Sequence, residues 1–179
     1  TPNHITLLSF FIGLLGAVGL ATTDPWFWLA GGFLIQVASI VNGCDGEIAR
    51  IKLLQSPRGA WLDTVLDRYS DLAIGLAVTF AASQLHDAVW VWPAGFAATA
   101  SFVMASYVTK EFQIQFHRPY PEFLVNKLKR RDLRILVVAV GAVIGQPLVA
   151  LLAIGALTHL AVFQILVSGW RATSVPHRC

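Results

Sequence analysis

Six long apolar segments constrain this chain of 179 residues more than any other feature of its sequence. A helix that crosses the hydrocarbon core of a bilayer needs about 20 mostly apolar residues. Only 13% of the residues are charged, whereas soluble domains carry about 25%. The sequence therefore predicts an all-α integral membrane protein, with six transmembrane helices in a single domain that covers residues 1–179. The predicted spans are residues 5–22, 26–50, 59–82, 88–110, 132–145 and 148–170.

The basic residues give these spans an orientation. All 13 lysines and arginines fall in or near the connections on one side of the six spans. The opposite connections, near residues 22–25, 83–88 and 145–147, contain none. Because Lys and Arg are enriched in cytoplasmic loops, we expect the basic side and both termini to be cytoplasmic. Part of the long basic connection, residues 123–131, is expected either to lie along lipid headgroups or to form an ordinary solvated loop.

Two stripes of polar residues interrupt the second and third predicted spans. The first stripe has a spacing of three or four residues, which places its members on one helix face; it consists of Asn42, Asp45, Gly46, Ala49 and Arg50. The second stripe has a spacing of four residues and consists of Gly59, Asp63, Asp67 and Asp71. The two spans run antiparallel across a short turn around Ser56–Pro57. The stripes are therefore expected to face each other near the cytoplasmic ends of these helices.

Acidic side chains in this position need a compensating charge. One acid at the centre of a membrane helix costs about 2.5–3.5 kcal/mol, and several acids also repel one another. A divalent cation would relieve both problems, and oxygen ligands without a His or Cys cluster indicate Mg²⁺, Mn²⁺ or Ca²⁺. Gly46 leaves room for a ligand, and Arg50 is suited to holding a phosphate. Two alternatives are interfacial acids paired with Arg50, Arg68 or water, and an ion transporter, since intramembrane acids also mark ion paths.

The two stripes resemble the signature of the CDP-alcohol phosphotransferase family, D-x2-D-G-x2-A-R-x(7–8)-G-x3-D-x3-D. Every fixed position matches except the first, where this chain has Asn42 in place of Asp. The resemblance implies a six-helix membrane domain, usually dimeric, with the active site at the cytoplasmic ends of the second and third helices. It also implies transfer of a phosphoalcohol group from a CDP-alcohol to the hydroxyl of a second alcohol, with release of CMP. No nucleic-acid partner is expected.

The resemblance also assigns roles to the residues of the signature. One or two Mg²⁺ or Mn²⁺ ions are expected to be bound by Asn42, Asp45, Asp63 and Asp67, and Asp67 is also expected to be the general base. The CDP group is expected to be received by Gly46, Ala49, Arg50 and Gly59. An amide at position 42 has no formal charge, so the sequence predicts weaker metal binding and slower catalysis. A catalytically impaired scaffold therefore stays open as an alternative.

The segments "GCDGEIARIK" and "LDTVLDRYSD" most resemble the branch that joins CDP-inositol to inositol 1-phosphate to make di-myo-inositol phosphate phosphate. That branch is often fused to an N-terminal cytidylyltransferase domain, and many family members have an N-terminal interfacial helix; we expect neither within this chain. A phosphorylated acceptor needs cations, for which the candidates are Arg131, Arg134 and Lys110, although they could instead anchor the topology. The rival within the family is a phospholipid synthase that uses CDP-diacylglycerol to make phosphatidylinositol phosphate or phosphatidylglycerol phosphate.

Overall fold

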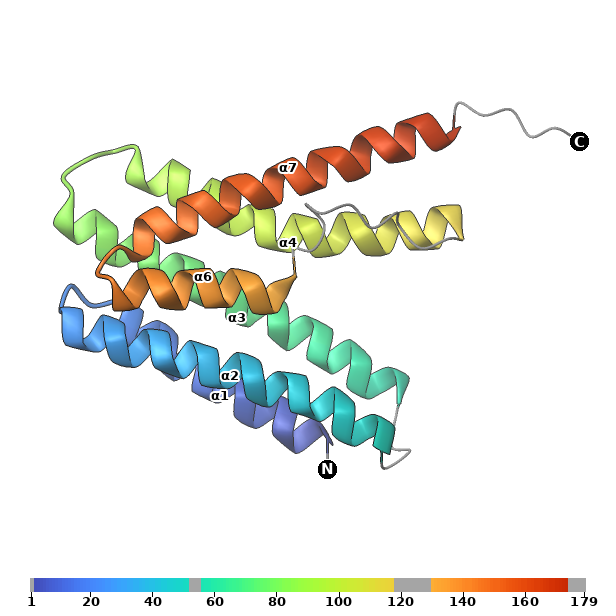
Figure 1. The fold of residues 1–179 in the computed structure, drawn as a ribbon, viewed down its shortest axis with the longest axis horizontal. Coiled ribbons are helices and arrows are strands. Elements are labelled where there is room, and N and C mark those ends of the chain that lie inside the picture. Colours follow the sequence, from blue (N-terminus) through green and yellow to red (C-terminus); the bar gives the residue numbers. More distant parts are fainter. Residues whose placement is uncertain (1, 52–55, 118–129, 174–179) are drawn as a thin grey trace, which may run out of the picture.

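The computed structural model describes residues 2–51, 56–117 and 130–173, apart from the side chains of residues 2, 45–50, 172 and 173. Helices account for nearly all of these residues, and this described part of the chain contains no strand. The helices are α1 (Pro2–Leu20), α2 (Pro25–Ile51), α3 (Pro57–Leu85), α4 (Val91–Phe116), α6 (Arg131–Val143) and α7 (Pro147–Thr173) (Figure 1). The predicted all-α chain is therefore confirmed. Residues 118–129 lie outside the described residues, so the interfacial position of the basic connection stays a prediction.

Local signals in the sequence start and end these helices. Ser56 caps α3, because its hydroxyl accepts a hydrogen bond from the backbone N–H of Gly59 at 3.0 Å. Between α6 and α7, Gly145 has a φ of +74°, a conformation that glycine adopts without strain. The short turn between α6 and α7 is therefore confirmed, and α3 begins at Pro57 as the predicted turn requires, while residues 52–55 lie outside the described residues. In contrast, α4 passes its predicted end at residue 110 and continues to Phe116, where His117 takes a left-handed conformation with φ +48°.

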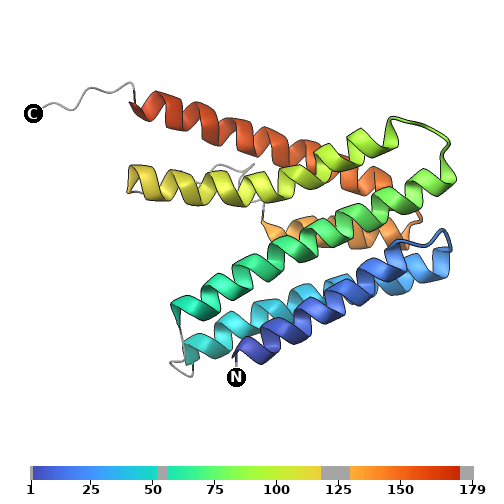
Figure 2. The ribbon, with the colours of Figure 1, turned by 180° about the vertical axis from the view of Figure 1, so that it is seen from behind.

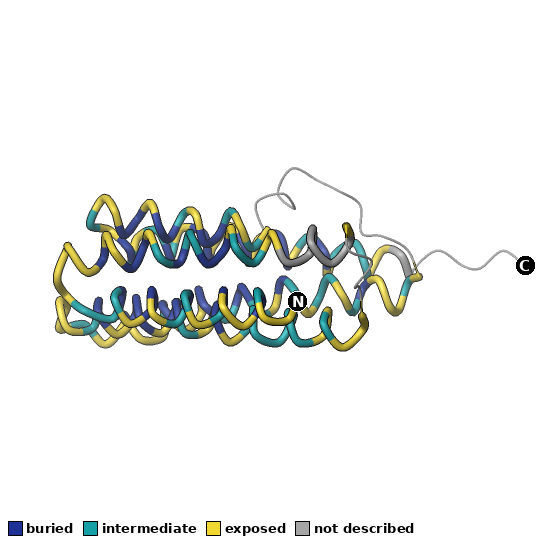
Figure 3. The backbone as a smooth tube through the Cα atoms, turned by 90° about the horizontal axis from the view of Figure 1, so that it is seen from below, coloured by how far each residue is buried: buried dark blue, intermediate teal, exposed yellow. Residues whose placement is uncertain are grey.

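The six helices form a closed ring of neighbours. α1 packs against α2 and α3, α2 packs against α6, and α3 packs against α4. α4 and α6 both pack against α7, which closes the ring (Figures 1 and 2). Figure 3 shows buried residues on the sides of the helices that face one another. Every helix contributes to this core, with residues that include Leu20, Ile35, Ile74, Phe102, Ile135 and Leu151.

Glycine allows neighbouring helices in this ring to approach closely. A Cβ atom on Gly75 of α3 would lie only 2.8 Å from the Cβ atom of Thr99 of α4. The reciprocal pair, Gly95 of α4 and Thr79 of α3, has the same spacing of 2.8 Å. A Cβ atom on Gly31 of α2 would likewise lie 2.7 Å from a carbonyl oxygen of α1. Small residues are a usual means of helix packing in lipid, where no hydrophobic force drives helices together.

Four of the helices are long and apolar enough to cross a membrane, over Asn3–Leu20, Pro25–Cys44, Val91–Phe116 and Pro147–Arg171. Large apolar side chains on the outside of α1, such as Phe11 and Leu15, offer a surface for lipid. The protein is therefore an integral membrane protein. α3 falls short in composition, because it carries charged residues in its first half, and α6 falls short in length, because its 13 residues make about 20 Å of helix. The prediction of six helices is thus confirmed, whereas only four of them have the composition of a membrane span.

Candidate active site

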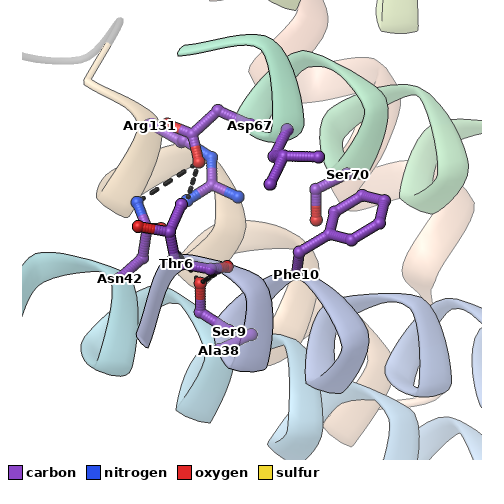
Figure 4. Close-up of a pocket in the computed structure, with 9 residues that line it drawn as sticks. Thr6, Ser9, Phe10, Ala38, Asn42, Asp67, Ser70 and Arg131 are labelled. Carbon is purple, nitrogen blue, oxygen red and sulfur yellow. Dashed lines mark hydrogen bonds and ion pairs between the residues drawn. The ribbon is translucent and has the colours of Figure 1, made fainter. Parts of the chain in front are cut away.

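The candidate site lies inside the ring, where the first half of α3 faces the end of α2. Asn42 of α2 lies opposite Asp67 of α3, and its Nδ2 donates a hydrogen bond to Asp67 Oδ1 at 3.2 Å (Figure 4). An ionised carboxylate only accepts hydrogen bonds, so the amide must turn its NH₂ group toward Asp67. The structure thus brings together two residues of the predicted site that are 25 positions apart in the sequence.

The first residue of α6 binds the same carboxylate. Arg131 Nη1 lies 3.1 Å from Asp67 Oδ1, and Arg131 Nε donates to Asp71 Oδ1 at 3.2 Å. The side chain of Arg131 is 14% exposed, so it is reachable from one edge of the site. Asp67 Oδ1 therefore receives donors from both α2 and α6. Among the described contacts, Asp67 Oδ2 has a more distant one, with Arg68 Nη2 at 3.8 Å.

Asp71 lies one turn deeper and forms the centre of a buried ionic cluster. Its side chain is 1% exposed, and its oxygens lie 3.3 Å from Arg68 Nη1, 3.2 Å from Arg131 Nε and 3.4 Å from Arg134 Nη2. Arg134 is 2% exposed, and its guanidinium carbon lies 4.5 Å above the ring of Phe102, in cation–π geometry. The structure therefore places Arg134 inside the bundle, behind Arg131.

The sequence predicted an acceptor-phosphate role for Arg131 and Arg134, but it did not predict their pairing with Asp71. Asp71 continues the four-residue spacing of the second stripe by one more turn, but it lies beyond the family signature. Arg68 was considered only as a partner for interfacial acids, whereas it also donates to the hydroxyl of Ser106 and the carbonyl oxygen of Phe102 on α4. One signal in the sequence could have indicated this cluster. Asp71 is a further acid within a predicted span, and several arginines are expected on the same side of the membrane.

Two further residues of the predicted site are Gly59, which belongs to the first half of α3, and Lys110, which contacts it from α4. Lys110 of α4 is exposed, and its Nζ donates a hydrogen bond to Thr64 Oγ1 at 3.0 Å. Gly59 lies in the first turn of α3, where a Cβ atom would be 3.0 Å from Asn3 Oδ1 of α1. Gly59 thus allows the start of α3 to lie close to the start of α1, while Lys110 ties α3 to α4.

Comparison with known proteins identifies the family that has this arrangement. The profile of the family described as CDP-alcohol phosphatidyltransferase matches residues 1–170. The chain belongs to this family. The matched region includes both polar stripes and the whole ring of helices apart from the last three residues of α7.

Curated relatives match nearly all of the length of this chain. A bifunctional IPC transferase and DIPP synthase of Rubrobacter xylanophilus is 39% identical over 176 residues, which are 97% of this chain and 38% of that protein. A protein of the same name from Aquifex aeolicus is 32% identical over 96% of this chain and 39% of its own length. The chain therefore spans about two fifths of the length of these relatives.

Solved structures have the same fold. The Mycobacterium tuberculosis phosphatidylinositol phosphate synthase PgsA1, crystallised with CDP-DAG bound, superposes with a TM-score of 0.78 at 20% identity, over 95% of this chain and 86% of that one. A structure of the same enzyme in complex with manganese and citrate gives a TM-score of 0.78 at 22% identity, over 95% and 82%. At this level of identity the likeness establishes the fold.

Four residues of the family signature have side chains outside the described part of the structure. They are Asp45, Gly46, Ala49 and Arg50, whose backbone forms the last turns of α2. Their predicted contacts with metal and CDP stay predictions.

The described residues fit a hard divalent cation in their chemistry. Asp63 and Asp67 lie one turn apart on α3, and Asp67 contacts the amide of Asn42. Both acids offer carboxylate oxygens, the ligands that Mg²⁺ and Mn²⁺ prefer. Within the described residues, no three His, Cys, Asp or Glu side chains gather closely enough to enclose a metal ion. Asp45, the further acid of the signature, has its side chain outside the described part of the structure.

Proposed function

We propose that this protein transfers a phosphoalcohol group from a CDP-alcohol to the hydroxyl group of a second alcohol and releases CMP. The observation that carries the proposal is the contact of Asn42, Asp67 and Arg131, which joins both halves of the family signature to the start of α6. In the reaction, the acceptor oxygen forms a bond to the phosphorus that bears the donor alcohol. The bond from this phosphorus to the bridging oxygen of the pyrophosphate breaks, and CMP leaves with that oxygen.

Asp67 is the proposed general base. Its Oδ1 atom is held by Asn42 and Arg131, which fixes the orientation of the carboxylate. The Oδ2 atom has only the distant contact with Arg68 among the described residues. A carboxylate that is held at one oxygen and accessible at the other can take the proton of the acceptor hydroxyl as the new bond to phosphorus forms.

Asp45, Asp63 and Asp67 would hold one or two Mg²⁺ or Mn²⁺ ions, whereas the metal role that the family signature predicts for Asn42 is not part of this proposal. When bound, such ions offset the negative charge of the pyrophosphate and of the departing CMP. The acids that would bind them come from α2 and α3, so the relative position of these two helices sets the geometry of the site.

The cytidine diphosphate group is proposed to bind at the end of α2 and the start of α3, at Gly46, Ala49, Arg50 and Gly59. Gly59 lies in the first turn of α3, where a Cβ atom would be 3.0 Å from Asn3 Oδ1 of α1, so its role toward CDP rests on the family signature. A guanidinium group at position 50 can bind a phosphate through two parallel hydrogen bonds.

Arg131 is the proposed contact for a phosphate group on the acceptor. It is partly exposed, it touches the proposed base, and it is the first residue of α6. A helix N-terminus favours anions, so the helix and the guanidinium act in the same direction. Arg134 would support Arg131 from behind through Asp71, and Lys110 would contribute positive charge from α4.

For the substrates, we propose CDP-inositol as donor and inositol 1-phosphate as acceptor. The proposal follows the resemblance around the signature, and it is supported by relatives over nearly the whole chain whose names include DIPP synthase. The second candidate is synthesis of a phospholipid from CDP-diacylglycerol. It is favoured by a phosphatidylinositol phosphate synthase of Cutibacterium acnes, which is 36% identical over 45% of this chain.

We propose that all six helices lie within the membrane, with both termini and the site on the cytoplasmic side. α3 can enter the bilayer because Asp67, Arg68 and Asp71 face inward, where arginines of α3 and α6 compensate Asp71. α6 can be short because α2 and α7 flank it within the ring. We further propose a homodimer, as the family resemblance implies.

The test is CMP release by the purified protein in lipid nanodiscs with Mg²⁺. We expect release with CDP-inositol plus inositol 1-phosphate, and little with CDP-diacylglycerol plus the same acceptor. The reverse preference would favour the phospholipid synthase. Absence of CMP release with both donors and with inositol, inositol 1-phosphate and glycerol 3-phosphate as acceptors would favour the catalytically impaired scaffold.

A further inference from the structure

Asn42 is oriented from both sides by neighbouring residues. Ser9 of α1 is 4% exposed, and its hydroxyl lies 3.0 Å from Asn42 Oδ1. On the other side, Asn42 Nδ2 donates to Asp67 Oδ1 at 3.2 Å (Figure 4). A continuous chain of hydrogen bonds therefore runs from α1 through α2 to α3.

The direction of this chain follows from the chemistry of its ends. Asp67 accepts only, so Asn42 must turn its NH₂ group to Asp67 and its carbonyl oxygen to Ser9. That oxygen needs a donor, and the Ser9 hydroxyl supplies its proton, which it shares with the carbonyl oxygen of Thr6 at 2.8 Å. Both ends of the Asn42 amide are thus used within the protein.

We propose that Asn42 is a positioning residue for Asp67 and is not a ligand of the metal. This inference rests on the proposed function, in which Asp67 is the general base. The amide oxygen, which is the atom that would coordinate a cation, points to Ser9 and away from Asp67. The amide NH₂ group, with Arg131, fixes Asp67 Oδ1 and leaves Oδ2 for the acceptor hydroxyl.

A carboxylate at position 42 would behave differently. Held in the same place, it would put a charged oxygen about 3 Å from Asp67 Oδ1, where two carboxylates repel unless a proton or a cation lies between them. The amide removes this repulsion and replaces it with a hydrogen bond. The hydrogen bonds from Ser9 through Asn42 therefore hold Asp67 in position before any cation binds, and cation binding depends on the three acids without Asn42.

The first test measures Mn²⁺ binding, which does not depend on activity. Free Mn²⁺ is followed by electron paramagnetic resonance during titration of the wild-type protein and of Asn42→Ala. We expect the two Mn²⁺ Kd values to agree within about twofold, while kcat for CMP release falls on the order of 10- to 100-fold with both substrate KM values nearly unchanged. A Kd for Mn²⁺ that rises tenfold or more in Asn42→Ala would make Asn42 a metal ligand and overturn the proposal.

The second test uses Ser9, which does not touch Asp67. Thermal melting in chelator is compared for Ser9→Ala, Asn42→Ala and the double variant. Because the two residues act through one chain, the loss in the double variant should be clearly smaller than the sum of the single losses. Ser83→Ala is the matched control, since Ser83 also donates to a backbone carbonyl three residues earlier, at 2.7 Å, but far from the site.

The outcomes of these tests separate the two proposals. Additive losses of thermal stability for Ser9→Ala and Asn42→Ala would contradict the hydrogen-bond chain through Asn42, whatever the CMP release shows. If no CDP-alcohol gives CMP with the wild-type protein, the proposed function fails, and the Mn²⁺ titration and the melting comparison still decide the role of Asn42.

Discussion

The two halves of α3 are held in place by different forces. The first half, residues 57–71, carries Asp67 and Asp71, which are paired with arginines of α3 and α6 and with the amide of Asn42. The second half, residues 72–85, buries small and apolar residues that include Gly75, Ala77, Val78 and Ala81. It meets α4 through pairs of glycine and threonine. One helix therefore has an ionic half and a close-packed half.

The difference shows how the fold supports a reactive site within a membrane protein. Charges without partners are costly in a low-dielectric interior, so the ionic half is sensitive to the loss of any one charge. The close-packed half has no charges to lose, and it is sensitive instead to added volume. It sets the distance between α3 and α4, and the ionic half then places Asp67 at the site.

The largest loss of stability is expected for Asp71→Ala. This change leaves three arginines around a buried position without their shared carboxylate, and breaking such a cluster costs about 3–5 kcal/mol. Asp132→Ala is the matched control, because Asp132 is 66% exposed and pairs with Arg130 at 3.0 Å, which is worth at most about 1 kcal/mol. The measurement is denaturant unfolding in detergent. Similar small losses for both variants would show that the cluster is not essential to the ionic half.

A smaller loss is expected when volume is added to the close-packed half. In Gly75→Leu the new side chain would meet Thr99 on α4, since a Cβ atom alone would lie 2.8 Å from the Cβ atom of Thr99. Overpacking of this kind costs about 1–3 kcal/mol. Gly43→Leu is the control, because nothing lies within 4 Å of a Cβ atom at Gly43. Equal unfolding midpoints for the two variants would contradict the close approach of α3 and α4.

Substitution of both Arg131 and Arg134 by Ala tests the acceptor site. The double variant removes the partly exposed guanidinium beside Asp67 and the buried one behind it. Because both arginines pair with the buried Asp71, the double variant should also lose stability. In protein that stays folded, we expect the acceptor KM to rise on the order of tenfold or more, with a much smaller change in the KM for the CDP-alcohol. Steady-state kinetics in nanodiscs give both constants. Equal effects on the two KM values would mean that these arginines only anchor the helix.

The smallest change in stability is expected for Asn42→Asp. In chelator the new carboxylate faces Asp67, so the melting temperature should fall by a few degrees, a loss on the order of 1 kcal/mol. Saturating Mg²⁺ should restore it, because ligand binding to the native state raises stability, and CMP release at low Mg²⁺ should rise. A variant that binds Mg²⁺ no better and releases no more CMP would show that the site is impaired elsewhere.

Much of this arrangement could be predicted from the sequence, because helical spacing is a local property. The spacing of Asn42 and Asp67 across a short turn placed them face to face, and Ser56 and Gly145 marked helix ends. The partners of Asp71 could not be predicted in this way, because Arg131 and Arg134 are 60 and 63 residues away. Such a pairing depends on how α6 enters the ring, which is decided by packing and not by spacing.

The central claim is that Asp67 is the base of a CDP-alcohol phosphotransferase. The most direct measurement is CMP release by the wild-type protein and by Asp67→Asn, with Mg²⁺, CDP-inositol and inositol 1-phosphate, and with Asp132→Asn as control. The amide has the size of the carboxylate but cannot take a proton, so CMP release should fall by about 10²–10⁴-fold in Asp67→Asn and stay near the wild-type rate in Asp132→Asn. A folded Asp67→Asn variant that releases CMP within about threefold of the wild-type rate would contradict the account.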